Sequence, residues 1–428
     1  MKTMKSLCGM LAVLAFTACS NDSDEATGSE NHIWHVTLTA SMGDATHRAL
    51  DADGNTITAS FAAGDVVEVV RADGSPVGPL TAKTTGASTT LEGNISGTFA
   101  ADEVLKLRYR SATANYDGQE GTLPGIAAGQ DYAGGTLTVK TVTPLAFESN
   151  SVTLAPQQSI TKFTFKDGSS DISVKTFGIA APGLVQSIAA NGTETVGAVT
   201  GTLATAKTEV YVALRNTYTS QQTYSFYIQD NDGNWYKGTK KATLTNGKNY
   251  TATVSMTKLA NLTSPYTEGT VGVIDGLPAI VIDFGGTIGK KAVALMNAGA
   301  LCPEHYGKYY SFANKASELS GSWYVPTKGE LESFIGAYSS SWGAPDGVNG
   351  RTFTIGSNTL FFPAAGLDDY DNSPSDFWNV STFGCYWSCE STLTEGLAYS
   401  LQFSSSVNNT YGEYKTDGLS VRPFHSLP

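Results

Sequence analysis

The chain has 428 residues, enough for two or three domains, and it is 41% hydrophobic and only 15% charged, with a net charge of −12. An aromatic content of 10% excludes a disordered chain, and the scarcity of Glu, Lys and Arg argues against a helical one. The negative charge and the lack of a basic stripe indicate that nucleic acid is not a partner. We therefore expect an extracellular β protein.

The N-terminal segment predicts export and lipidation. Lys2 and Lys5 precede an apolar run over residues 7–18. That run is shorter than the about 20 residues that span a bilayer, and it is typical of a secretory signal. It ends in AFTAC at residues 15–19, which resembles a bacterial lipobox and implies cleavage after residue 18 and lipidation of Cys19. An ordinary signal with a chance cysteine is the alternative.

Residues 19–31 predict an acidic flexible tether, because they contain few apolar side chains to bury. Acidic residues directly after a lipidated cysteine resemble the surface-export signal of Bacteroidia-type lipoproteins. We expect an outer-membrane lipoprotein precursor at the cell surface.

Residues 32–259 form a succession of short predicted strands. Apolar and polar residues alternate over residues 105–110, 162–166 and 250–256, as in strands with one solvent-facing side. The turn formers DNDGN at 230–234 separate two apolar runs and predict a hairpin. Short strands at this spacing are typical of β-sandwiches, and the length suggests two, over residues 32–150 and 151–259.

This region resembles the Bacteroidia-type fimbrillin family (type V pilus). The resemblance rests on residues 36–70, which contain VTLTA and FAAGDVVEV, and on a second half from PLAF at 144 to YTATV at 254. Members of this family are lipoprotein-exported pilus subunits with two transthyretin-like β-sandwich domains. The resemblance implies that the chain is cut after Arg48, which leaves Ala49 as the first residue and removes a strand that carries His32 and His35.

Loss of that strand would open a groove, and a strand from another fimbrillin subunit would fill it by donor-strand complementation. The alternative is that Arg48 is a solvated loop residue.

Residues 260–428 predict a third, mixed module. Residues 271–278 read as a tight turn between strands, residues 289–298 and 312–319 as short helices, and residues 397–404 as a half-buried strand. Thr327 and Glu330 have the spacing of a capping box. A helix then follows with Leu331, Phe334, Ile335 and Tyr338 on one face.

Four ordered blocks resemble the Fibrobacter-type major paralogous domains, which are similar to C-type-lectin-like folds. They are WYVPTKGEL at 323–331, FPAAG at 362–366, GCYWS at 384–388 and GLSVRP at 418–423. The predicted fold class is therefore mainly β: two tandem transthyretin-like β-sandwich domains followed by an α+β C-type-lectin-like domain. The resemblance implies a lectin-like shape rather than sugar binding itself.

The predicted ligand surface lies in one segment of this module. It comprises Asp368, Asp369, Tyr370, Asp371, Asp376, Trp378 and Asn379. The usual lectin calcium triplet is broken because Val380 follows Trp378-Asn379. The four aspartates could bind Ca²⁺ at another site or form a solvated loop. Tyr370, Phe377, Trp378 and Trp387 could stack on a sugar or pack in the core. No other cofactor is expected.

Three cysteines remain beyond the N-terminal segment: Cys302, Cys385 and Cys389. In a strand, Cys385 and Cys389 would be ~13 Å apart, beyond disulfide reach, so a bridge from Cys302 to either is the candidate. A metal site is less expected because no pair has C-x-x-C spacing.

Catalytic motifs are lacking. GGTIGKK at 285–291 lacks phosphate-loop spacing, and neither G-x-S-x-G nor H-E-x-x-H occurs. Cys302 and His305 form a weak nucleophile pair, since nothing nearby in the sequence would orient the base. We predict no enzymatic activity.

The module order predicts a fimbrial tip subunit. A second sandwich that runs directly into a lectin-like domain leaves no free donor tail, so the subunit would accept a strand and not give one. Its C-terminal module would bind an unidentified glycan or protein receptor. The alternatives are a monomeric glycan-binding surface lipoprotein and a structural stalk or anchor pilin.

Overall fold

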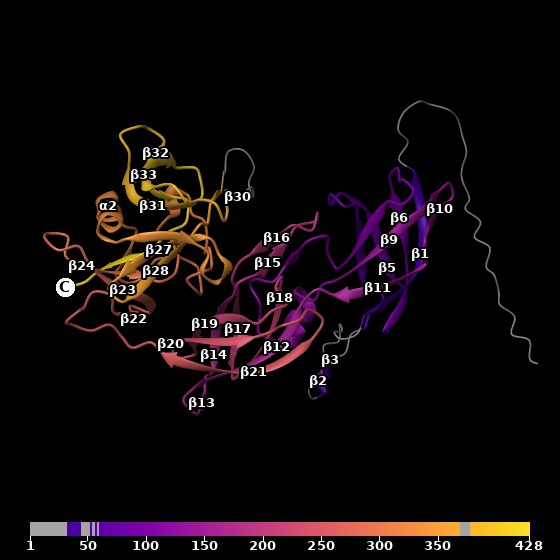
Figure 1. The fold of residues 1–428 in the computed structure, drawn as a ribbon, viewed down its shortest axis with the longest axis horizontal. Helices are drawn as coiled ribbons and strands as arrows, with labels where there is room; N and C mark the ends of the chain where they lie inside the picture. The colour runs from indigo at the N-terminus through magenta and orange to yellow at the C-terminus, as the bar shows by residue number, and fades with distance from the viewer. Residues whose placement is uncertain (1–31, 44–51, 54–55, 58–59, 369–376) are drawn as a thin grey trace, which may run out of the picture.

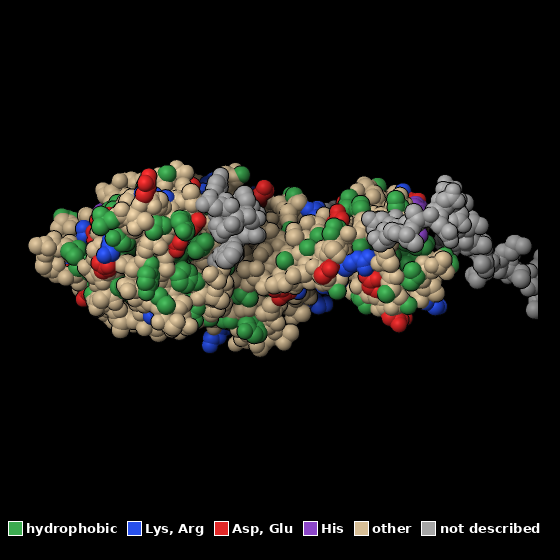
Figure 2. Space-filling model, turned by 90° about the horizontal axis from the view of Figure 1, so that it is seen from above, with side chains coloured by type: hydrophobic (Ala, Val, Ile, Leu, Met, Phe, Trp, Pro, Cys, Tyr) green, Lys and Arg blue, Asp and Glu red, His purple; other side chains and the backbone are tan. Residues whose placement is uncertain are grey.

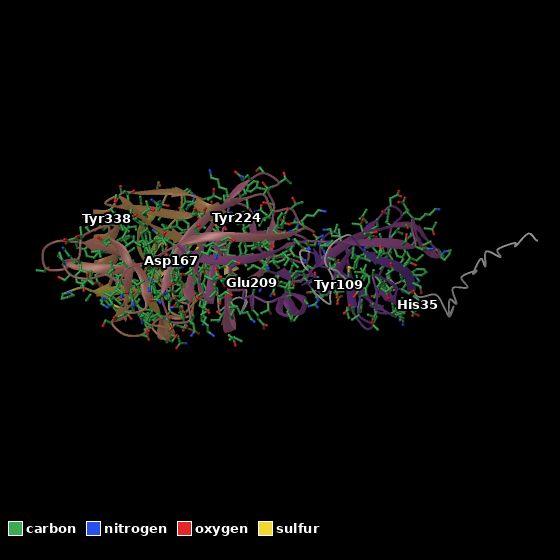
Figure 3. The ribbon with its side chains drawn as sticks, turned by 90° about the horizontal axis from the view of Figure 1, so that it is seen from below. His35, Tyr109, Asp167, Glu209, Tyr224 and Tyr338 are labelled. Atoms are coloured by element: carbon green, nitrogen blue, oxygen red, sulfur yellow. The ribbon has the colours of Figure 1, made fainter. Side chains whose placement is uncertain are left out.

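The computed structural model describes residues 32–43, 52–53, 56–57, 60–368 and 377–428. The protein is mainly β, with several sheets and two α-helices among the described residues. The modules follow one another along the longest axis (Figure 1). His35 near the N-terminus and Tyr338 in the third module are labelled toward opposite ends of the molecule (Figure 3).

The first module is an eight-stranded sheet around one core. Its strands, in spatial order, are β10 (Leu145–Phe147), β9 (Ala133–Val142), β11 (Ser151–Pro156), β1 (Ile33–Met42), β6 (Ser88–Ser96), β5 (Pro76–Ala82), β4 (Val66–Val70) and β7 (Val104–Tyr109). Strand β9 also pairs with β7, which closes the sheet on itself. Strand β11 completes this sheet, whereas we placed residues 151–156 in the second sandwich.

The second module is an eleven-stranded sheet that curls around the largest core cluster. Nine of its strands follow one another in the spatial order β16 (Glu194–Val196), β15 (Leu184–Ile188), β18 (Glu209–Asn216), β12 (Ser159–Asp167), β21 (Asn249–Lys258), β20 (Trp235–Ala242), β19 (Gln222–Asp230), β14 (Val174–Ala180) and β17 (Val199–Lys207). The other two strands pair at the side of this order: β13 (Ser170–Asp171) pairs with β12, and β8 (Ala114–Asn115) pairs with β15. The predicted hairpin is the β19–β20 pair, which turns at residues 231–234.

A segment between β7 and β9 crosses from the first module to the second. There β8 pairs with β15, and Tyr116 and Ile126 are buried in the second core. The buried Gln119 side chain exchanges hydrogen bonds of 2.7 and 2.9 Å with the backbone of Ala213. The helix α1 (Leu123–Gly129) is capped by the side chain of Thr122. The chain thus passes between the two modules three times, a connection that we did not predict.

The third module combines small sheets with one helix. Its five-stranded sheet has the order β22 (Val271–Ile274), β23 (Leu277–Asp283), β24 (Lys290–Ala294), β34 (Phe424–Ser426) and β25 (Trp323–Tyr324). Two three-stranded sheets are β26 (Ser340–Gly343), β27 (Gly350–Ile355), β28 (Asn358–Pro363) and β31 (Gly384–Ser391), β32 (Leu397–Phe403), β33 (Asn408–Tyr414). A two-stranded pair, β29 (Leu367–Asp368) with β30 (Phe377–Trp378), completes the third module. A similar short pair, β2 (Ala52–Asp53) with β3 (Thr56–Ile57), lies in the first part of the chain.

The predicted capped helix is confirmed as α2 (Lys328–Ala337). Thr327 and Glu330 form the full capping box, and Leu331 and Phe334 are buried. The ring of Phe334 lies 4.5 Å from that of Phe353, which anchors the helix in the core. None of the helices in the described residues is long and apolar enough to cross a membrane.

Two predicted helices of this module are wrong. Residues 289–298 contain the strand β24, which lies between β23 and β34 with Ala292, Val293 and Ala294 all buried. Residues 312–319 contain only the single 3₁₀ turn η1 (Phe312–Asn314), and a second such turn, η2, covers Pro345–Gly347. A strand buried on both faces lacks alternation, so its apolar run cannot be told from that of a buried helix.

The third module packs directly on the second. The indole Nε1 of Trp235 donates to the backbone oxygen of Gly276 at 2.9 Å, and the Ser225 hydroxyl donates to Asp346 Oδ2 at 2.9 Å. A side-chain carbon on Gly178 would lie 2.7 Å from Cys302 Cβ, so glycine permits this close approach. We call this contact the 2–3 joint.

Candidate functional site

Strand β1 lies in the interior of the first sheet. It pairs antiparallel with β6 from Ile33↔Ser96 to Ser41↔Ser88, and parallel with β11 from Thr39↔Ser151 to Met42↔Leu154. Hydrogen-bonded neighbours therefore flank the strand on both sides. Its removal would expose one backbone edge on β6 and another on β11, and such edges accept a strand from another chain.

The inward face of β1 fills part of the first core. Val36, Leu38 and Ala40 are 5%, 2% and 0% exposed and belong to the cluster that contains Leu91 and Leu154. Burying a Val or Leu side chain fully is worth about 1.5–3 kcal/mol. The alternate residues of the strand face solvent, so β1 contributes only one apolar face to the core, between β6 and β11.

The polar contacts of β1 lie at the surface. His35 Nε2 is 3.0 Å from Glu92 Oε1, and its Nδ1 is 3.1 Å from Asn94 Oδ1. Lys83 and then His35 lower the pKa of the Glu92 carboxyl. Exposed pairs of this kind contribute little, so β1 is held by its ladders and its apolar face.

The predicted cleavage site, Arg48 and Ala49, lies outside the described residues, as does Cys19. On its N-terminal side the chain is fixed at Gly43, whose N–H donates to Leu154 O at 2.9 Å. On its C-terminal side it is fixed at Phe61, which is fully buried in the same core and bridges to Gly86. A cut between these two points would leave β1 held by noncovalent contacts alone.

The predicted ligand surface of the third module is described only at its edges. Asp369, Tyr370, Asp371 and Asp376 lie outside the described residues, and for Trp378 only the backbone is described, in β30. Asp368 pairs with Phe377 across the β29–β30 ladder, and its Oδ1 is buried without a hydrogen-bond partner. Asn379 is exposed with φ 59°, and its backbone oxygen accepts from Thr382 and Phe383 at 3.0 Å, as in a turn.

Within the described ranges, no group of three or more His, Cys, Asp or Glu side chains could hold a metal ion. Trp387 is fully buried, and its indole N–H donates to Tyr310 O at 2.6 Å. It is therefore a core residue, which removes it from the sugar-stacking candidates.

Aromatic residues that sequence reasoning missed lie on the edge strand β33. Tyr411 and Tyr414 are 46% and 63% exposed. Exposed tyrosines can contact a ligand with an apolar ring and a polar tip. The signal was the polar-aromatic run NNTYGEY at 408–414, which we had not singled out.

The three cysteines are free thiols, so the candidate disulfide is not formed. Cys302 is buried at the 2–3 joint, Cys385 is buried within the third module, and Cys389 is exposed. Burial raises the pKa of the Cys302 and Cys385 thiols, which opposes nucleophilic reactivity.

His305 does not serve Cys302 as a base. Its Nε2 is 2.9 Å from Asp117 Oδ2, and its Nδ1 accepts from the Gly307 N–H at 3.0 Å. Both ring nitrogens of His305 are therefore occupied by partners other than Cys302. Burial favours a higher pKa for Asp117, but hydrogen bonds from His305 and Thr200 outweigh it and lower the pKa.

Comparisons with known proteins give distant similarities. Residues 349–424 match a family model described as a domain of unknown function (DUF8237). No curated protein matches the chain. Among solved structures, a candidate cell adhesion protein from Bacteroides ovatus is 12% identical, covering 54% of this chain and 96% of that one, with a TM-score of 0.30. A candidate cell adhesion protein from Bacteroides uniformis is 15% identical over 52% and 96%, with a TM-score of 0.31.

The shaft pilin SpaA from Lactobacillus rhamnosus GG, as a double mutant, is 13% identical over 54% of this chain and 100% of that one, with a TM-score of 0.23. At these scores we base no functional argument on the solved structures.

Proposed function

We propose that this chain is a subunit of a surface pilus whose first module accepts a strand from a neighbouring subunit after β1 is removed. In this proposal the chain is exported as an outer-membrane lipoprotein through Cys19 and is cut between Arg48 and Ala49. The first two modules act as transthyretin-like sandwiches, and the third is a lectin-like module that adheres to a glycan or protein receptor. No catalytic step is required.

One observation carries the proposal: β1 is an interior strand that a single cut would release. A replacement strand that runs in the direction of β1 would restore the antiparallel ladder to β6 and the parallel ladder to β11. It would need small or medium apolar side chains at alternate positions to fill the space of Val36, Leu38 and Ala40. Main-chain hydrogen bonds would supply affinity and these pockets specificity.

The position of β34 argues against its use as a donor strand. Phe424 is fully buried, and β34 lies between β24 and β25 in the third module. Donating this strand to another subunit would break the five-stranded sheet. The third module also lies at the opposite end of the molecule from His35 on β1, where it would face outward when a neighbour binds at β1 (Figure 3).

A truncated chain tests the groove. We expect a chain that begins at Ala49 to bind a synthetic peptide of residues 32–43 at a 1:1 ratio, measured by fluorescence anisotropy. A control peptide with Leu38→Asp should not bind, because a carboxylate would be buried in an apolar core. Equal binding of the two peptides, or unchanged stability of the truncated chain without peptide, would contradict the proposal. An uncut, lipidated protein on cells would favour the monomeric glycan-binding lipoprotein.

A further inference from the structure

A basic hollow lies in the first module, beside its contact with the second. It is a cavity of about 520 Å³ lined by Lys106, Arg108, Gly134, Gly135, Thr136, Ser151, Val152, Thr153 and Gln157. These residues come from β7, β9, β11 and the link to β12. We call this hollow the waist cavity, since the molecule narrows between these two modules in Figure 2.

The cavity arises where β9 changes partners. Strand β11 pairs with β9 only through Ala155 and Pro156, whereas Ser151 to Leu154 pair with β1 instead. The pairing of β9 with β11 ends at this point, and the hollow lies there beside Lys106 and Arg108 of β7. Gly134 and Gly135 on β9 line it without side chains.

Two cations face this hollow together. A side-chain carbon on Gly192, in the β15–β16 turn of the second module, would lie 3.3 Å from Arg108 Nη2 and 3.5 Å from Lys106 Nζ. The two nitrogens are therefore at most about 6.8 Å apart. Lys106 Nζ donates to the backbone oxygens of Ala72 at 3.1 Å and Asn191 at 2.9 Å, which leaves its charge without a carboxylate.

Arg108 makes no direct contact with a counter-ion among the described residues, although Tyr116 and Glu194 lie close enough to favour its charged form. Within the part of the chain that the structure describes, its guanidinium makes no hydrogen bond or ion pair, and its Nε is buried without a partner. Glu68 lies opposite Arg108 in the β4–β7 ladder but forms no ion pair with it. Burial and then the neighbouring Arg215 lower the pKa of Arg108, and the opposing effects of Tyr116 and Glu194 do not outweigh them.

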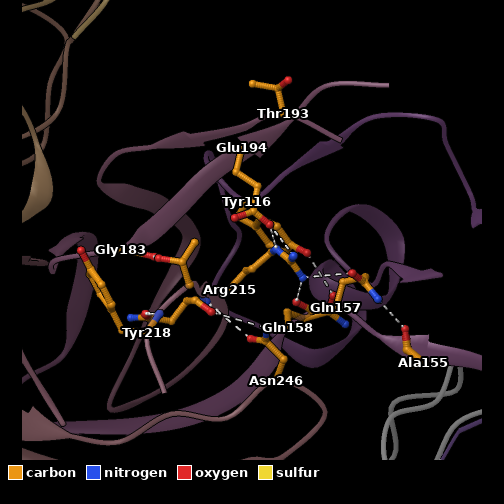
Figure 4. Close-up of polar contacts among 12 residues, drawn as sticks. Tyr116, Ala155, Gln157, Gln158, Gly183, Thr193, Glu194, Arg215, Tyr218 and Asn246 are labelled. Atoms are coloured by element: carbon orange, nitrogen blue, oxygen red, sulfur yellow. Dashed lines mark hydrogen bonds and ion pairs between the residues drawn. The ribbon is translucent and has the colours of Figure 1, made fainter. Parts of the chain in front are cut away.

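Glu194, the carboxylate that favours the charge of Arg108, is already engaged with another arginine. Arg215 Nε donates to Glu194 Oε1 at 2.8 Å, and its Nη1 donates to the backbone and side-chain oxygens of Gln157 at 2.8 and 3.0 Å. Figure 4 shows Arg215 between Glu194 and Gln157. Glu194 thus serves Arg215. In a chain of net charge −12, a half-buried guanidinium without a partner beside a second cation is an unsatisfied anion site.

We propose that the waist cavity binds an oxyanion group, a sulfate or carboxylate, carried by an acidic saccharide. The guanidinium fork of Arg108 and the ammonium of Lys106 would hold the anion, and the hydroxyls of Thr136, Ser151 and Thr153 would face the sugar. The volume exceeds that of a lone sulfate and lies in the range of small-molecule sites. This inference concerns the chain with β1 in place, because Ser151 and Thr153 lie on β11 beside that strand, and it assigns ligand binding to a module other than the third.

Calorimetric titration of the chain without its predicted signal tests the site. A sulfated disaccharide should bind, with affinity that falls as salt rises, and a neutral disaccharide should not. Inorganic sulfate is titrated separately at the same ionic strength. If sulfate binds as tightly as the disaccharide, the anion alone is recognised. If sulfate binds more weakly, the sugar contributes to binding. Both results support an oxyanion site, and no binding of either anion would overturn it.

Arg108→Gln should weaken binding of the sulfated disaccharide at least about tenfold, because it removes a charge-assisted hydrogen bond to the anion. Lys140→Gln removes the same charge from an exposed position on β9 and should bind like the parent chain. Arg108→Gln should not lower the melting temperature, because the arginine makes no hydrogen bond or ion pair among the described residues, and burial and Arg215 together outweigh the attraction of Glu194 and Tyr116. A variant that is destabilised, or one that binds like the parent chain, would show that Arg108 is structural and would overturn the proposal.

Discussion

We expect a buried carboxylate at the 2–3 joint to make the stability of this protein depend on pH. Glu304 is 8% exposed, and its Oε2 has no hydrogen-bond partner. Burial, with Asp346 as the next cause, raises the pKa of Glu304 to about 7. Tyr227, Cys302 and Asp346 also lie close to it, and Arg422 is the cation that partly offsets these effects.

The expected magnitude follows from this pKa. The folded protein holds a proton on Glu304 up to about pH 7, whereas the unfolded chain loses it near 4.5. Each pKa unit corresponds to about 1.4 kcal/mol, so ionisation should cost the fold about 3 kcal/mol at pH 8 and less than about 1 kcal/mol at pH 5. Stability is therefore lost as pH rises through this window. Glu304→Gln, which mimics the neutral acid, should restore it at pH 8.

Urea unfolding followed by tryptophan fluorescence at pH 5 and pH 8 provides the assay. We expect Glu304→Gln to stabilise the protein by about 3 kcal/mol at pH 8 and to have little effect at pH 5. Glu395→Gln, which removes an exposed carboxylate in the same module, should change stability little at either pH. An equal effect of Glu304→Gln at both pH values would refute the reasoning, because the carboxylate would then not be held neutral by burial.

Three further predictions concern β1, the capped helix and the thiols. Leu38→Ala should destabilise the first module by about 2–5 kcal/mol in chemical denaturation, and a loss below about 1 kcal/mol would show that β1 is not part of the core. Thr327→Ala should remove the capping box and cost about 1 kcal/mol by the same assay, whereas no loss would mean that the cap is dispensable. Iodoacetamide should label Cys389 but neither Cys302 nor Cys385 in the native protein, as read by peptide mass, and labelling of Cys302 would contradict its burial.

The features that sequence predicted correctly have local causes. Alternation identified β7, because one face of that strand is buried and the other is at least partly exposed. Strand β32 forms at the predicted residues, but Ala398 and Ser400 on its expected solvent face are buried, and Leu397 and Tyr399 on the other face are only half-buried. The turn at 231–234 and the capping box of α2 each depend on side chains a few residues apart. Such signals can be read from a short stretch of sequence.

The features that sequence missed depend on distant residues. Strand β24 is buried on both faces, so its pattern matched a helix as well as a strand. The segment from β8 to α1 belongs to the second core because Gln119 and Tyr116 meet partners nearly a hundred residues away or in another sheet. The contact between Asp117 and His305 spans 188 residues, and no local pattern indicates it.

The central claim is that the first strand is released by a cut after Arg48, and the N-terminus of the surface protein tests it most directly. Protein sheared from whole cells can be analysed by intact mass and peptide sequencing. We predict that Ala49 is the first residue and that the peptide carrying His35 is absent from the assembled form. A protein that begins with a lipidated Cys19, with no cleaved form, would contradict the claim.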